Sequence, residues 1–358
     1  MATVVGPDLA RDRVLALLRR HGWNATSFQV LEPAFHHWFD GDDACVGYVD
    51  TGRAWVAAGA PIAPTARLAE VARRFDAAAR AAGRRTAWFA TERRFSDATG
   101  WPALRIGDQP VWSPAAWSAV VASSRGLREQ LRRARAKGVV VRAVAAEELT
   151  VGHPTRVGIE RLIARWQATR PMAPMSFLVQ LDPFSFAAER RTFVAEQGGA
   201  VVALLGIIPI YARAGWFFED FVRDPDAPNG TVELLVDAGM RAAAAADVPL
   251  VTLGLAPLAG EVPGPLRAAR RLGRPLYDFD GLRAFKAKFR PGAWDPVYLT
   301  YPPGRRGAAA LLDALRAFAG GGLVRFGLAT AHRTPLAWRL AFAAIVAAIA
   351  VALVLALA

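Results

Sequence analysis

The sequence predicts a mixed α/β protein with mixed sheets, built from two copies of one unit and followed by a C-terminal membrane-spanning helix. Short apolar, β-like runs alternate with helical patterns along the chain. In each half, a strand, a proline-containing turn, an alanine-rich helix and a short strand follow one another. The final residues, 340–358, contain no polar side chain. These three observations predict the fold class and the order of the helices and strands.

The first half is predicted to hold one α/β unit. Apolar residues at helical spacing predict an amphipathic helix over Pro7–Arg20. A second helix, Thr65–Ala82, follows a proline-containing turn at residues 60–64. A strongly basic helix over Leu127–Lys137 ends at Gly138 and precedes a β-branched run. The predicted strands are Phe28–Leu31, Cys45–Val49, Ala54–Ala58 and Thr86–Ala90.

The second half is predicted to repeat this order. Its elements are a helix, Pro154–Thr169, and the strands Arg191–Ala195, Val201–Ile210, Trp216–Val222 and Leu250–Leu255. A loop over residues 223–230 contains two prolines, which make it rigid, and it precedes a helix over residues 231–245. Asn229 or Thr231 can cap this helix, and Glu233 in its first turn is favourable for the helix dipole.

Domain limits follow from the repeat. We expect a first unit over residues 1–146 and a second, catalytic unit over residues 147–303. Residues 304–335 form an amphipathic linker, and residues 336–358 form the transmembrane helix. The chain of 358 residues is long enough for such cores.

The C-terminal apolar segment is long enough to cross a bilayer, whose hydrocarbon core is about 30 Å thick. Basic residues precede it and no charge follows it, so the positive-inside rule places the preceding domains in the cytoplasm. A buried core helix is the alternative, but such helices rarely run this long without a polar residue. No secretory leader is recognisable at the N-terminus. We therefore expect a single-pass membrane protein.

The charge balance indicates an anionic partner. The formal net charge of +13 favours nucleic acid or an anionic lipid surface, although scattered surface charge would give the same number. Arginine stands at almost every basic position, and the chain has only three lysines. A site that needs a compact ammonium cannot accept arginine instead, so the neighbouring Lys286 and Lys288 are candidate functional residues. Cys45 is the only cysteine, which excludes an internal disulfide.

Several common sites are not indicated. The five histidines lack zinc-site spacing and no cysteine cluster is present, so no metal is expected. The sequence has no G-x-S-x-G elbow and no P-loop, which removes the main support for a hydrolase or an NTPase. We expect no bound cofactor.

Two adjacent acids lie in an aromatic stretch. If residues 216–222 form a regular strand, Glu219 and Phe221 point to one face, while Asp220 and Val222 point to the other. A carboxylate held there among aromatic rings would have a shifted pKa and could act as a general base or bind an ammonium group. The alternative is an ion pair of Asp220 with Arg223 that only fixes the loop.

The basic helix presents arginines at i, i+3 and i+4 spacing, which places them on one side. These residues are Arg125, Arg128, Arg132 and Arg135. Such a stripe suits the phosphates of tRNA or of lipid headgroups. A solvated surface helix is the alternative, but uncompensated like charges would cost stability unless an anion lay near.

The sequence resembles the C-terminal synthase domain of lysyl- and alanyl-phosphatidylglycerol synthases, the phosphatidylglycerol lysyltransferase C-terminal domain family. The resemblance covers the chain from about residue 120 to residue 302. Its most specific part is D-x-x-R-x-P-D-A-P-N-G-T at residues 220–231, combined with F-K-x-K-F at residues 285–289. The matching stretches are Leu127–Val141, Arg170–Met175 with Phe177, Glu189–Glu196, Asp220–Leu235, Thr252–Leu258 and Leu282–Pro302.

The resemblance implies a tandem GNAT-type acyltransferase fold and a membrane-bound bacterial enzyme. The implied reaction transfers an aminoacyl group from aminoacyl-tRNA to the glycerol hydroxyl of phosphatidylglycerol, an anionic phospholipid. It assigns Asp220, Arg223 and Lys288 as catalytic residues. Further substrate-binding candidates are Lys286, Asn229, Glu233 and Glu219. The expected location is the bacterial inner membrane, with the catalytic domain in the cytoplasm.

Two alternatives stay open. The chain could be a GNAT-type acyltransferase that uses acyl-CoA or an acyl carrier on another membrane substrate, although the Q/R-x-x-G-x-G/A phosphate signature is not visible. It could also be a non-catalytic basic module that binds membranes or RNA. The multi-span flippase region of full-length family members is not present in this sequence, so we expect no lipid translocation here.

Overall fold

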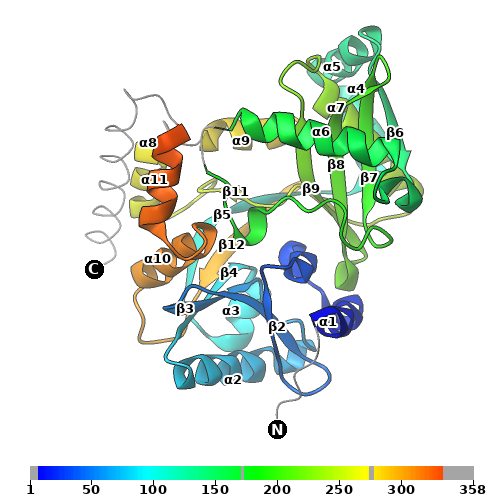
Figure 1. Cartoon of the computed structure of the whole chain (residues 1–358). Helices are drawn as coiled ribbons and strands as arrows, with labels where there is room; N and C mark the ends of the chain where they lie inside the picture. The colour runs from blue at the N-terminus through cyan, green and yellow to red at the C-terminus, as the bar shows by residue number, and fades with distance from the viewer. Residues whose placement is uncertain (1–6, 171–172, 274–277, 334–358) are drawn as a thin grey trace.

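A single large mixed sheet runs through the protein in a computed structural model that describes residues 7–170, 173–273 and 278–333 (Figure 1). Its twelve strands follow the order β1-β2-β3-β4-β12-β5-β10-β9-β8-β7-β6, and β11 pairs with β5. Helices pack on the faces of the sheet in both lobes of the molecule. The mixed α/β class expected from the sequence is therefore confirmed.

The first half contains five strands and five helices among the described residues. The strands are β1 (His36–Phe39), β2 (Cys45–Asp50), β3 (Ala54–Ala58), β4 (Arg85–Thr91) and β5 (Ala103–Trp112). The helices are α1 (Pro7–His21), α2 (Leu68–Ala81), α3 (Arg93–Thr99), α4 (Trp117–Ser123) and α5 (Arg125–Ala136). A 3₁₀ helix, η1 (Ala25–Leu31), follows α1.

The second half adds the remaining elements. Its strands are β6 (Val140–Val144), β7 (Arg191–Gln197), β8 (Ala200–Ile210), β9 (Gly215–Arg223), β10 (Val251–Thr252), β11 (Ala256–Pro257) and β12 (Ala293–Thr300). Its helices are α6 (Pro154–Ala168), α7 (Thr231–Ala245), α8 (Gly264–Gly273), α9 (Phe279–Ala287), α10 (Gly307–Phe318) and α11 (Leu323–Arg333). The short 3₁₀ helix η5 (Phe177–Val179) lies in the connection from α6 to β7.

The two halves share one connectivity. Antiparallel strands lead into a parallel β-α-β crossover through an alanine-rich helix, which is β3-α2-β4 in the first half and β9-α7-β10 in the second. The strand β12 departs from a simple sequential division, because it is hydrogen-bonded between β4 and β5 of the first half. The division at residues 146 and 303 stays a prediction.

One predicted strand is wrong. Residues 28–31 belong to the 3₁₀ helix η1, whose residues are buried except for Thr26. A short apolar run has the same pattern in a buried strand and in a buried helical turn, so its sequence alone does not distinguish them. The predicted strand at residues 250–255 is also shorter than expected, since only Val251 and Thr252 pair with neighbouring strands.

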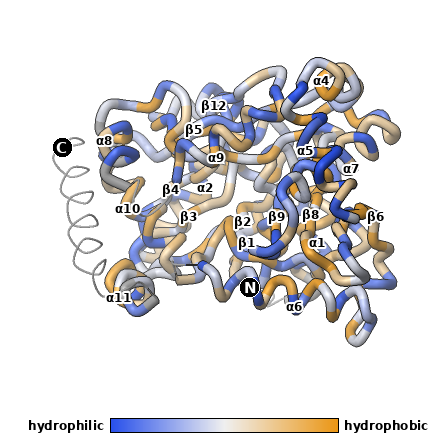
Figure 2. The backbone as a smooth tube through the Cα atoms, turned by 90° about the horizontal axis from the view of Figure 1, so that it is seen from above, coloured by the Kyte–Doolittle hydropathy of each residue, from blue (hydrophilic) through white to orange (hydrophobic). Residues whose placement is uncertain are grey.

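The largest hydrophobic core joins the two halves. It includes Leu17 of α1, Phe28 of η1, Ile208 of β8 and Leu299 of β12. Hydrophobic strand segments occupy the middle of the molecule in Figure 2, whereas outer helices such as α5 carry hydrophilic stretches. Because side chains of both halves share this core, the segment around η1 is fixed against β8.

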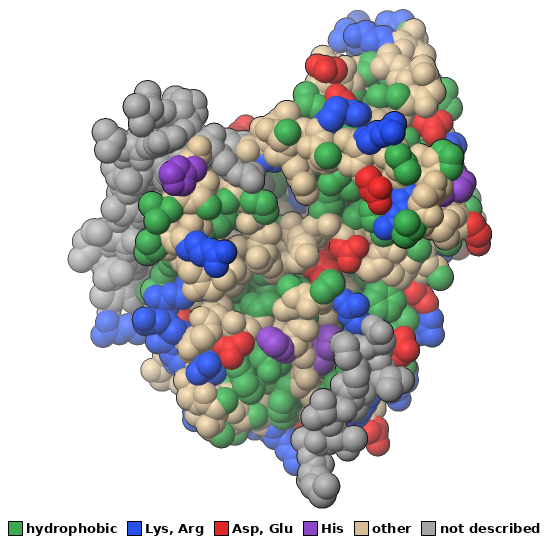
Figure 3. All heavy atoms as spheres, viewed as in Figure 1, with side chains coloured by type: hydrophobic (Ala, Val, Ile, Leu, Met, Phe, Trp, Pro, Cys, Tyr) green, Lys and Arg blue, Asp and Glu red, His purple; other side chains and the backbone are tan. Residues whose placement is uncertain are grey.

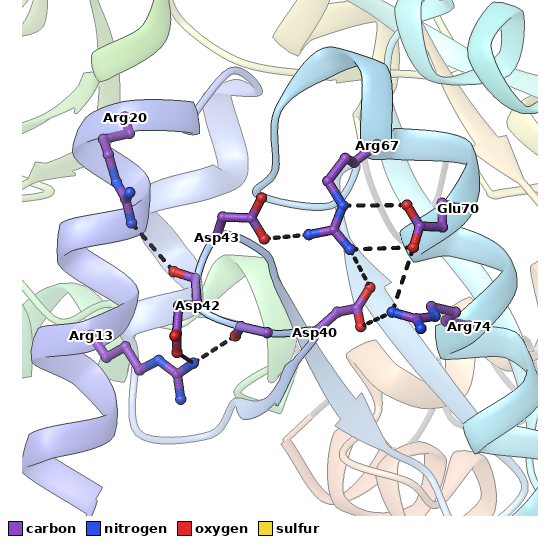
Figure 4. Close-up of polar contacts among 9 residues, drawn as sticks. Arg13, Arg20, Asp40, Asp42, Asp43, Arg67, Glu70 and Arg74 are labelled. Atoms are coloured by element: carbon purple, nitrogen blue, oxygen red, sulfur yellow. Dashed lines mark hydrogen bonds and ion pairs between the residues drawn. The ribbon is translucent and has the colours of Figure 1, made fainter.

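An ion-pair network fixes the turn between β1 and β2 against two helices (Figure 4). Asp40 accepts hydrogen bonds from Arg67 at 2.8 Å and from Arg74 at 2.6 Å. Arg13 of α1 pairs with Asp42 at 2.9 Å. The pairs of Asp40 are partly buried and the Arg13–Asp42 pair is exposed, and together they restrict the position of the turn.

The C-terminal helices pack on the first half. Asp313 of α10 is fully buried and pairs with Arg85 of β4 at 2.8 Å and with Arg305 at 2.9 Å. The transmembrane helix expected at residues 336–358 lies outside the described residues. Within the described ranges, no single helix has the length and apolar composition of a membrane span. The α10 helix and residues 323–330 meet these criteria only as a pair, which is bent by 52°.

Candidate active site

A β-bulge in β9 turns two neighbouring acids toward the same face of the sheet. Phe218 pairs with Ile207 and Asp220 pairs with Gly206, so Glu219 is an extra residue in the β8–β9 ladder. A bulge of this kind interrupts the alternation of side chains. The expectation that Glu219 and Asp220 point to opposite faces is therefore wrong.

Glu219 and Asp220 lie in a buried acidic cluster with Glu32 and Arg190. Arg190, which precedes β7, donates from Nη1 to Oε2 of Glu219 at 2.7 Å. The side chains of this pair are 3% and 6% exposed. Glu32 follows η1 and is 2% exposed. Figure 3 shows acidic side chains at the waist of the molecule, between the two lobes.

Several carboxylate oxygens in this cluster have no hydrogen-bond partner among the residues that the structure describes. They are both oxygens of Glu32, Oε1 of Glu219 and Oδ2 of Asp220. A buried carboxylate oxygen without a donor is costly, and groups of this kind gather where a ligand or a reaction uses them. The cluster therefore has free capacity to accept hydrogen bonds from a ligand.

Burial and mutual repulsion shift the pKa values of two of these acids. Burial, followed by the charge of Glu219, raises the pKa of Glu32 to about 9. The same two causes raise the pKa of Asp220 well above its usual value, and the charge of Arg190 opposes the rise. A cation beside these carboxyls would restore their ionised forms. The site can thus bind an ammonium group or accept a proton.

Lys286 lies where β10 separates from β9. The last pair of the β9–β10 ladder is Thr252 with Phe217, and the described strands give the rest of β9 no neighbour on that side. Nζ of Lys286 donates to the backbone oxygens of Leu253, Gly254 and Leu255 at 2.7, 2.8 and 2.8 Å. Burial lowers the pKa of Lys286 to about 7, whereas three carbonyl oxygens favour its charged form.

These contacts give Lys286 a structural role. All three ammonium donors are used by the protein backbone, so no donor is left for a substrate. The carbonyl groups of residues 253–255 would otherwise be unpaired where the two strands part. Lys286 therefore fixes the segment that follows β10, and the substrate contact expected from the sequence would require one of these hydrogen bonds to be exchanged.

Lys288 and Glu233 form a pair at the start of α7. Nζ of Lys288 contacts Oε1 of Glu233, and the two side chains are 39% and 11% exposed. The ammonium also lies 4.3 Å from the ring centre of Phe285 and 5.3 Å from that of Phe289. This arrangement leaves a partly exposed cation against aromatic rings, which is suited to an incoming anion.

The loop at residues 223–230 is fixed by its own contacts. Arg223 donates to the backbone oxygen of Ala227, and Asp224 pairs with Arg165 of α6 at 2.6 Å. Gly230 precedes α7 with a φ of 94°, and a Cβ atom there would collide with the backbone oxygen of Gln130. The expected side-chain cap is wrong, since Gly230 occupies the capping position and Asn229 is exposed.

Most of the arginines of α5 have ion-pair or hydrogen-bond partners, in contrast to the unpaired charges expected from the sequence. Arg132 pairs with Glu129 at 2.9 Å, and Arg135 pairs with Asp237 of α7 at 3.2 Å. Arg128 donates to the carbonyl oxygens at the end of α4. The expectation of four uncompensated charges is therefore wrong, because Glu129 and the neighbouring helix neutralise part of the stripe. Arg125 is exposed at the beginning of α5.

The predicted catalytic residues divide between the two faces of β9. Asp220 faces the acidic cluster, whereas Phe221 faces the other side, where its ring centre lies 6.3 Å from that of Phe285, beside Lys288. Arg223 is engaged within its loop. The structure brings Asp220 together with Glu219, and Lys288 together with Glu233, but no contact joins Asp220, Arg223 and Lys288.

Sequence reasoning missed Glu32 and Arg190. Arg190 lies inside one of the stretches that carry the family resemblance, so the sequence contained a signal that it is a candidate site residue. Glu32 follows a run that was predicted to be a strand, and nothing in the sequence relates it to residues 190–220. Only the packing of η1 against β8 brings these positions together.

The comparisons with known proteins agree with this fold. The family "Phosphatidylglycerol lysyltransferase, C-terminal" matches residues 15–301. The chain is 29% identical over 140 residues to the lysylphosphatidylglycerol biosynthesis bifunctional protein LysX of Mycobacterium ulcerans. It is 31% identical over 139 residues to the protein of that name from Mycolicibacterium vanbaalenii. Each match covers 38% of this chain but only 12% of the relative.

Two solved structures share the fold over most of the chain. The C-terminal domain of a putative lysylphosphatidylglycerol synthetase from Agrobacterium fabrum superposes with a TM-score of 0.75 at 22% identity, covering 89% of this chain and 99% of that one. The structure of L-PGS from Bacillus licheniformis gives a TM-score of 0.72 at 19% identity, covering 89% and 97%. The chain belongs to the phosphatidylglycerol lysyltransferase C-terminal domain family and is a transferase.

Proposed function

We propose that the protein transfers an aminoacyl group from aminoacyl-tRNA to phosphatidylglycerol or a related anionic lipid. Family membership supports the transfer itself, and the observation that carries the site assignment is the buried cluster of unpaired carboxylate oxygens around Asp220. An aminoacyl group brings an ammonium, which is the cation that these oxygens can bind.

The reaction is an ester exchange. The lipid hydroxyl oxygen bonds to the aminoacyl carbonyl carbon and gives up its proton, and the carbonyl oxygen becomes an oxyanion. The bond to the ribose oxygen of the tRNA then breaks, and that oxygen takes a proton. Asp220 is our candidate for the group that holds the aminoacyl ammonium or accepts the hydroxyl proton.

The opposite face of β9 suits the anionic part of the reaction. We assign Lys288, placed beside Glu233 and two aromatic rings, to the lipid phosphate or to the oxyanion. Arg223 can bind the same anion once its side chain releases the backbone oxygen of Ala227. Because no other described strand pairs with β9 beyond Phe217 on its β10 side, the two substrates can approach from the two faces and meet at this edge. Asn229 is exposed in the same loop and stays a substrate-binding candidate.

The donor and the membrane are further parts of the proposal. The exposed Arg125 and the other arginines of α5, which are in part neutralised, are our candidates for contacts with tRNA or lipid phosphates. We also propose that the halves are two GNAT-type units, supported by the repeated β-α-β crossover. Residues 336–358, with the basic residues before them, would anchor the enzyme in the inner membrane with its catalytic part in the cytoplasm.

Lipid extracts from bacteria with and without the gene test this function. We expect a new lipid with the mass of an aminoacyl group added to phosphatidylglycerol, formed by isolated membranes only when charged tRNA is supplied and lost after ribonuclease treatment. The Lys288→Ala protein, expressed at equal level, should give no such lipid. If no aminoacylated lipid forms with any aminoacyl-tRNA, the proposal is wrong.

A further inference from the structure

We propose that the helix α11 docks on the surface of an anionic lipid bilayer through a face formed by Val324, Arg325 and Leu328. The proposal rests on the proposed function in one respect, because it takes residues 336–358 as a membrane anchor. The docking face itself lies wholly within the described helix α11.

The helix α11 turns apolar side chains outward. Val324 is 77% exposed and Leu328 is 60% exposed. These two residues are one helical turn apart, and the exposed Arg325 lies on the same side. Figure 3 shows hydrophobic side chains on the surface where Figure 1 places α11. Surface helices normally turn their apolar residues toward the core, so an outward apolar face is typical of a contact surface.

The charges around this face favour an anionic partner. Asp313 is the last acidic residue of the sequence, and the basic residues that follow it are Arg316, Arg325, His332, Arg333 and Arg339. Arg325 has no ion-pair partner in the part of the chain that the structure describes. Apolar side chains beside an arginine are suited to a bilayer surface, because the apolar groups enter the headgroup region and the guanidinium contacts lipid phosphate.

The length of α11 and of the chain that follows it favours a bilayer as the partner. Its 11 residues extend over about 16 Å, whereas the hydrocarbon core is about 30 Å thick, so α11 can lie on a bilayer but cannot cross one. Residues 334–339 separate it from the apolar segment 340–358, and they can span at most about 25 Å. An anchor at residues 340–358 would therefore hold α11 close to the lipid surface.

The preceding helix, α10, cannot share this role. Its apolar residues Ala310, Ala314 and Ala317 are buried, and its Asp313 is paired with arginines in the core. Packing on β3 and β4 explains the apolar composition of α10. The same explanation does not hold for Val324 and Leu328, because they point away from the described core.

The inner side of α11 is tied to the acidic cluster. Thr330 is fully buried, and its Oγ1 accepts from the backbone nitrogen of Ala173 at 3.2 Å. In the same connection, the backbone nitrogen of Ser176 donates to the last residue of α10 at 2.9 Å. Farther along, the backbone oxygen of Ser185 accepts from Nε of Arg190 at 3.0 Å. Docking of α11 would therefore orient the cluster relative to the lipid.

A fluorescent label on the docking side tests the proposal in the full chain. Ala329 is exposed beside Leu328, so Ala329→Cys accepts a thiol-reactive bimane and keeps the docking residues. The buried Cys45 should not react, which the unsubstituted chain verifies. Val151→Cys is the control, since Val151 is 86% exposed in the turn before α6.

The labelled proteins are placed in nanodiscs of phosphatidylcholine and phosphatidylglycerol. We expect a nitroxide-labelled lipid to quench the label at position 329 at least threefold more than the label at position 151, and iodide in the water to show the opposite order. Equal quenching at the two positions would overturn the docking. A label at position 329 that neither quencher reaches would overturn it as well, because the chain itself would then cover this face.

The charge of Arg325 gives a second test. In discs that contain phosphatidylglycerol, Arg325→Gln should shift the ratio of docked to undocked α11 about fivefold toward the undocked form. In discs of phosphatidylcholine alone, the same substitution should have no effect. An equal effect in both lipids, or no effect in either, would overturn the anionic surface as the partner.

The transfer reaction can fail separately from the docking. If the label at position 329 is quenched by lipid but no aminoacylated lipid forms with any charged tRNA, the docking stands and the proposed reaction is wrong. If aminoacylated lipid forms while this label is no closer to lipid than the control, the reaction stands and the docking is wrong. A full chain that does not enter the discs would overturn both the anchor and the docking.

Discussion

Asp220 lies directly opposite Gly206 in the β8–β9 ladder, and a Cβ atom at Gly206 would be 3.0 Å from Oδ2 of Asp220. The missing side chain of Gly206 thus provides the space in which the Asp220 carboxyl lies. The backbone of Gly206 does not need a positive φ. Its requirement for glycine comes from this close approach.

We predict that Gly206→Ala displaces the Asp220 carboxyl and lowers aminoacyl transfer by at least tenfold. The free energy of unfolding should change by only about 1 kcal/mol, because alanine is compatible with the backbone and only one side chain has to move. Gly126→Ala on α5 is the matched control, since a Cβ atom there meets no neighbour within 4 Å. Full activity of a folded Gly206→Ala protein would contradict the role of Asp220.

Glu32→Gln should stabilise the protein at alkaline pH. In the unfolded chain, the Glu32 carboxyl loses its proton near the ordinary pKa of 4.5, whereas in the folded protein it keeps the proton up to about pH 9. The folded state therefore binds more protons between these values, so the free energy of unfolding falls as the pH rises through this range.

At pH 8, denaturant titration should show the Glu32→Gln protein to be more stable than the wild type by about 1–3 kcal/mol. The difference should shrink as the pH falls and disappear only well below pH 4.5, where the Glu32 carboxyl is protonated in both the folded and the unfolded wild-type chains. A loss of stability at pH 8 would show that the Glu32 carboxyl is paired in the folded protein.

Lys286 is predicted to matter for stability. Lys286→Met fits the same space but leaves the carbonyl oxygens of residues 253–255 without donors in a buried place. We expect a loss of about 2–4 kcal/mol in the free energy of unfolding, together with a loss of activity. A protein of wild-type stability would mean that water or a neighbouring strand pairs with these carbonyl groups.

Lys288 is predicted to behave in the opposite way. Its side chain is 39% exposed, so Lys288→Met should change the free energy of unfolding by less than about 1 kcal/mol. Transfer should nevertheless fall by at least a hundredfold, because the lipid phosphate or the oxyanion loses its cation. The two methionine variants, measured side by side, distinguish a structural lysine (Lys286) from a functional one (Lys288). If both variants lose the same activity and the same stability, these two roles are wrong.

Much of the fold was predictable from periodicity. The helix at residues 231–245 and the strand at residues 54–58 have the predicted bounds, because strong patterns and a clear helix start specify them locally. The strands β5 and β12 were missed. Gly107 and Pro110 interrupt β5, and Pro296 interrupts β12, so neither strand shows a clean apolar run.

The site was predictable only in part. The motif identified Asp220 and Lys288, and the aromatic stretch before the motif indicated Glu219. The bulge in β9 decides which way the two acids point, and a bulge depends on the pairing of two strands. Lys286 and Lys288 are two residues apart on the chain, yet one is buried on backbone carbonyls and the other is partly exposed. Glu32 comes from a segment that is distant in sequence and meets the site only through the shared core.

The most direct test of the account is transfer by the purified full chain in vesicles that contain phosphatidylglycerol. Total tRNA charged with radiolabelled amino acids is supplied, and the radioactivity that enters the lipid phase is measured for the wild type and for Asp220→Asn. We expect the wild type to label the lipid and the folded Asp220→Asn protein to label it at least a hundredfold more slowly. Equal labelling by both proteins, or no labelling by the wild type, would contradict a catalytic site built around Asp220.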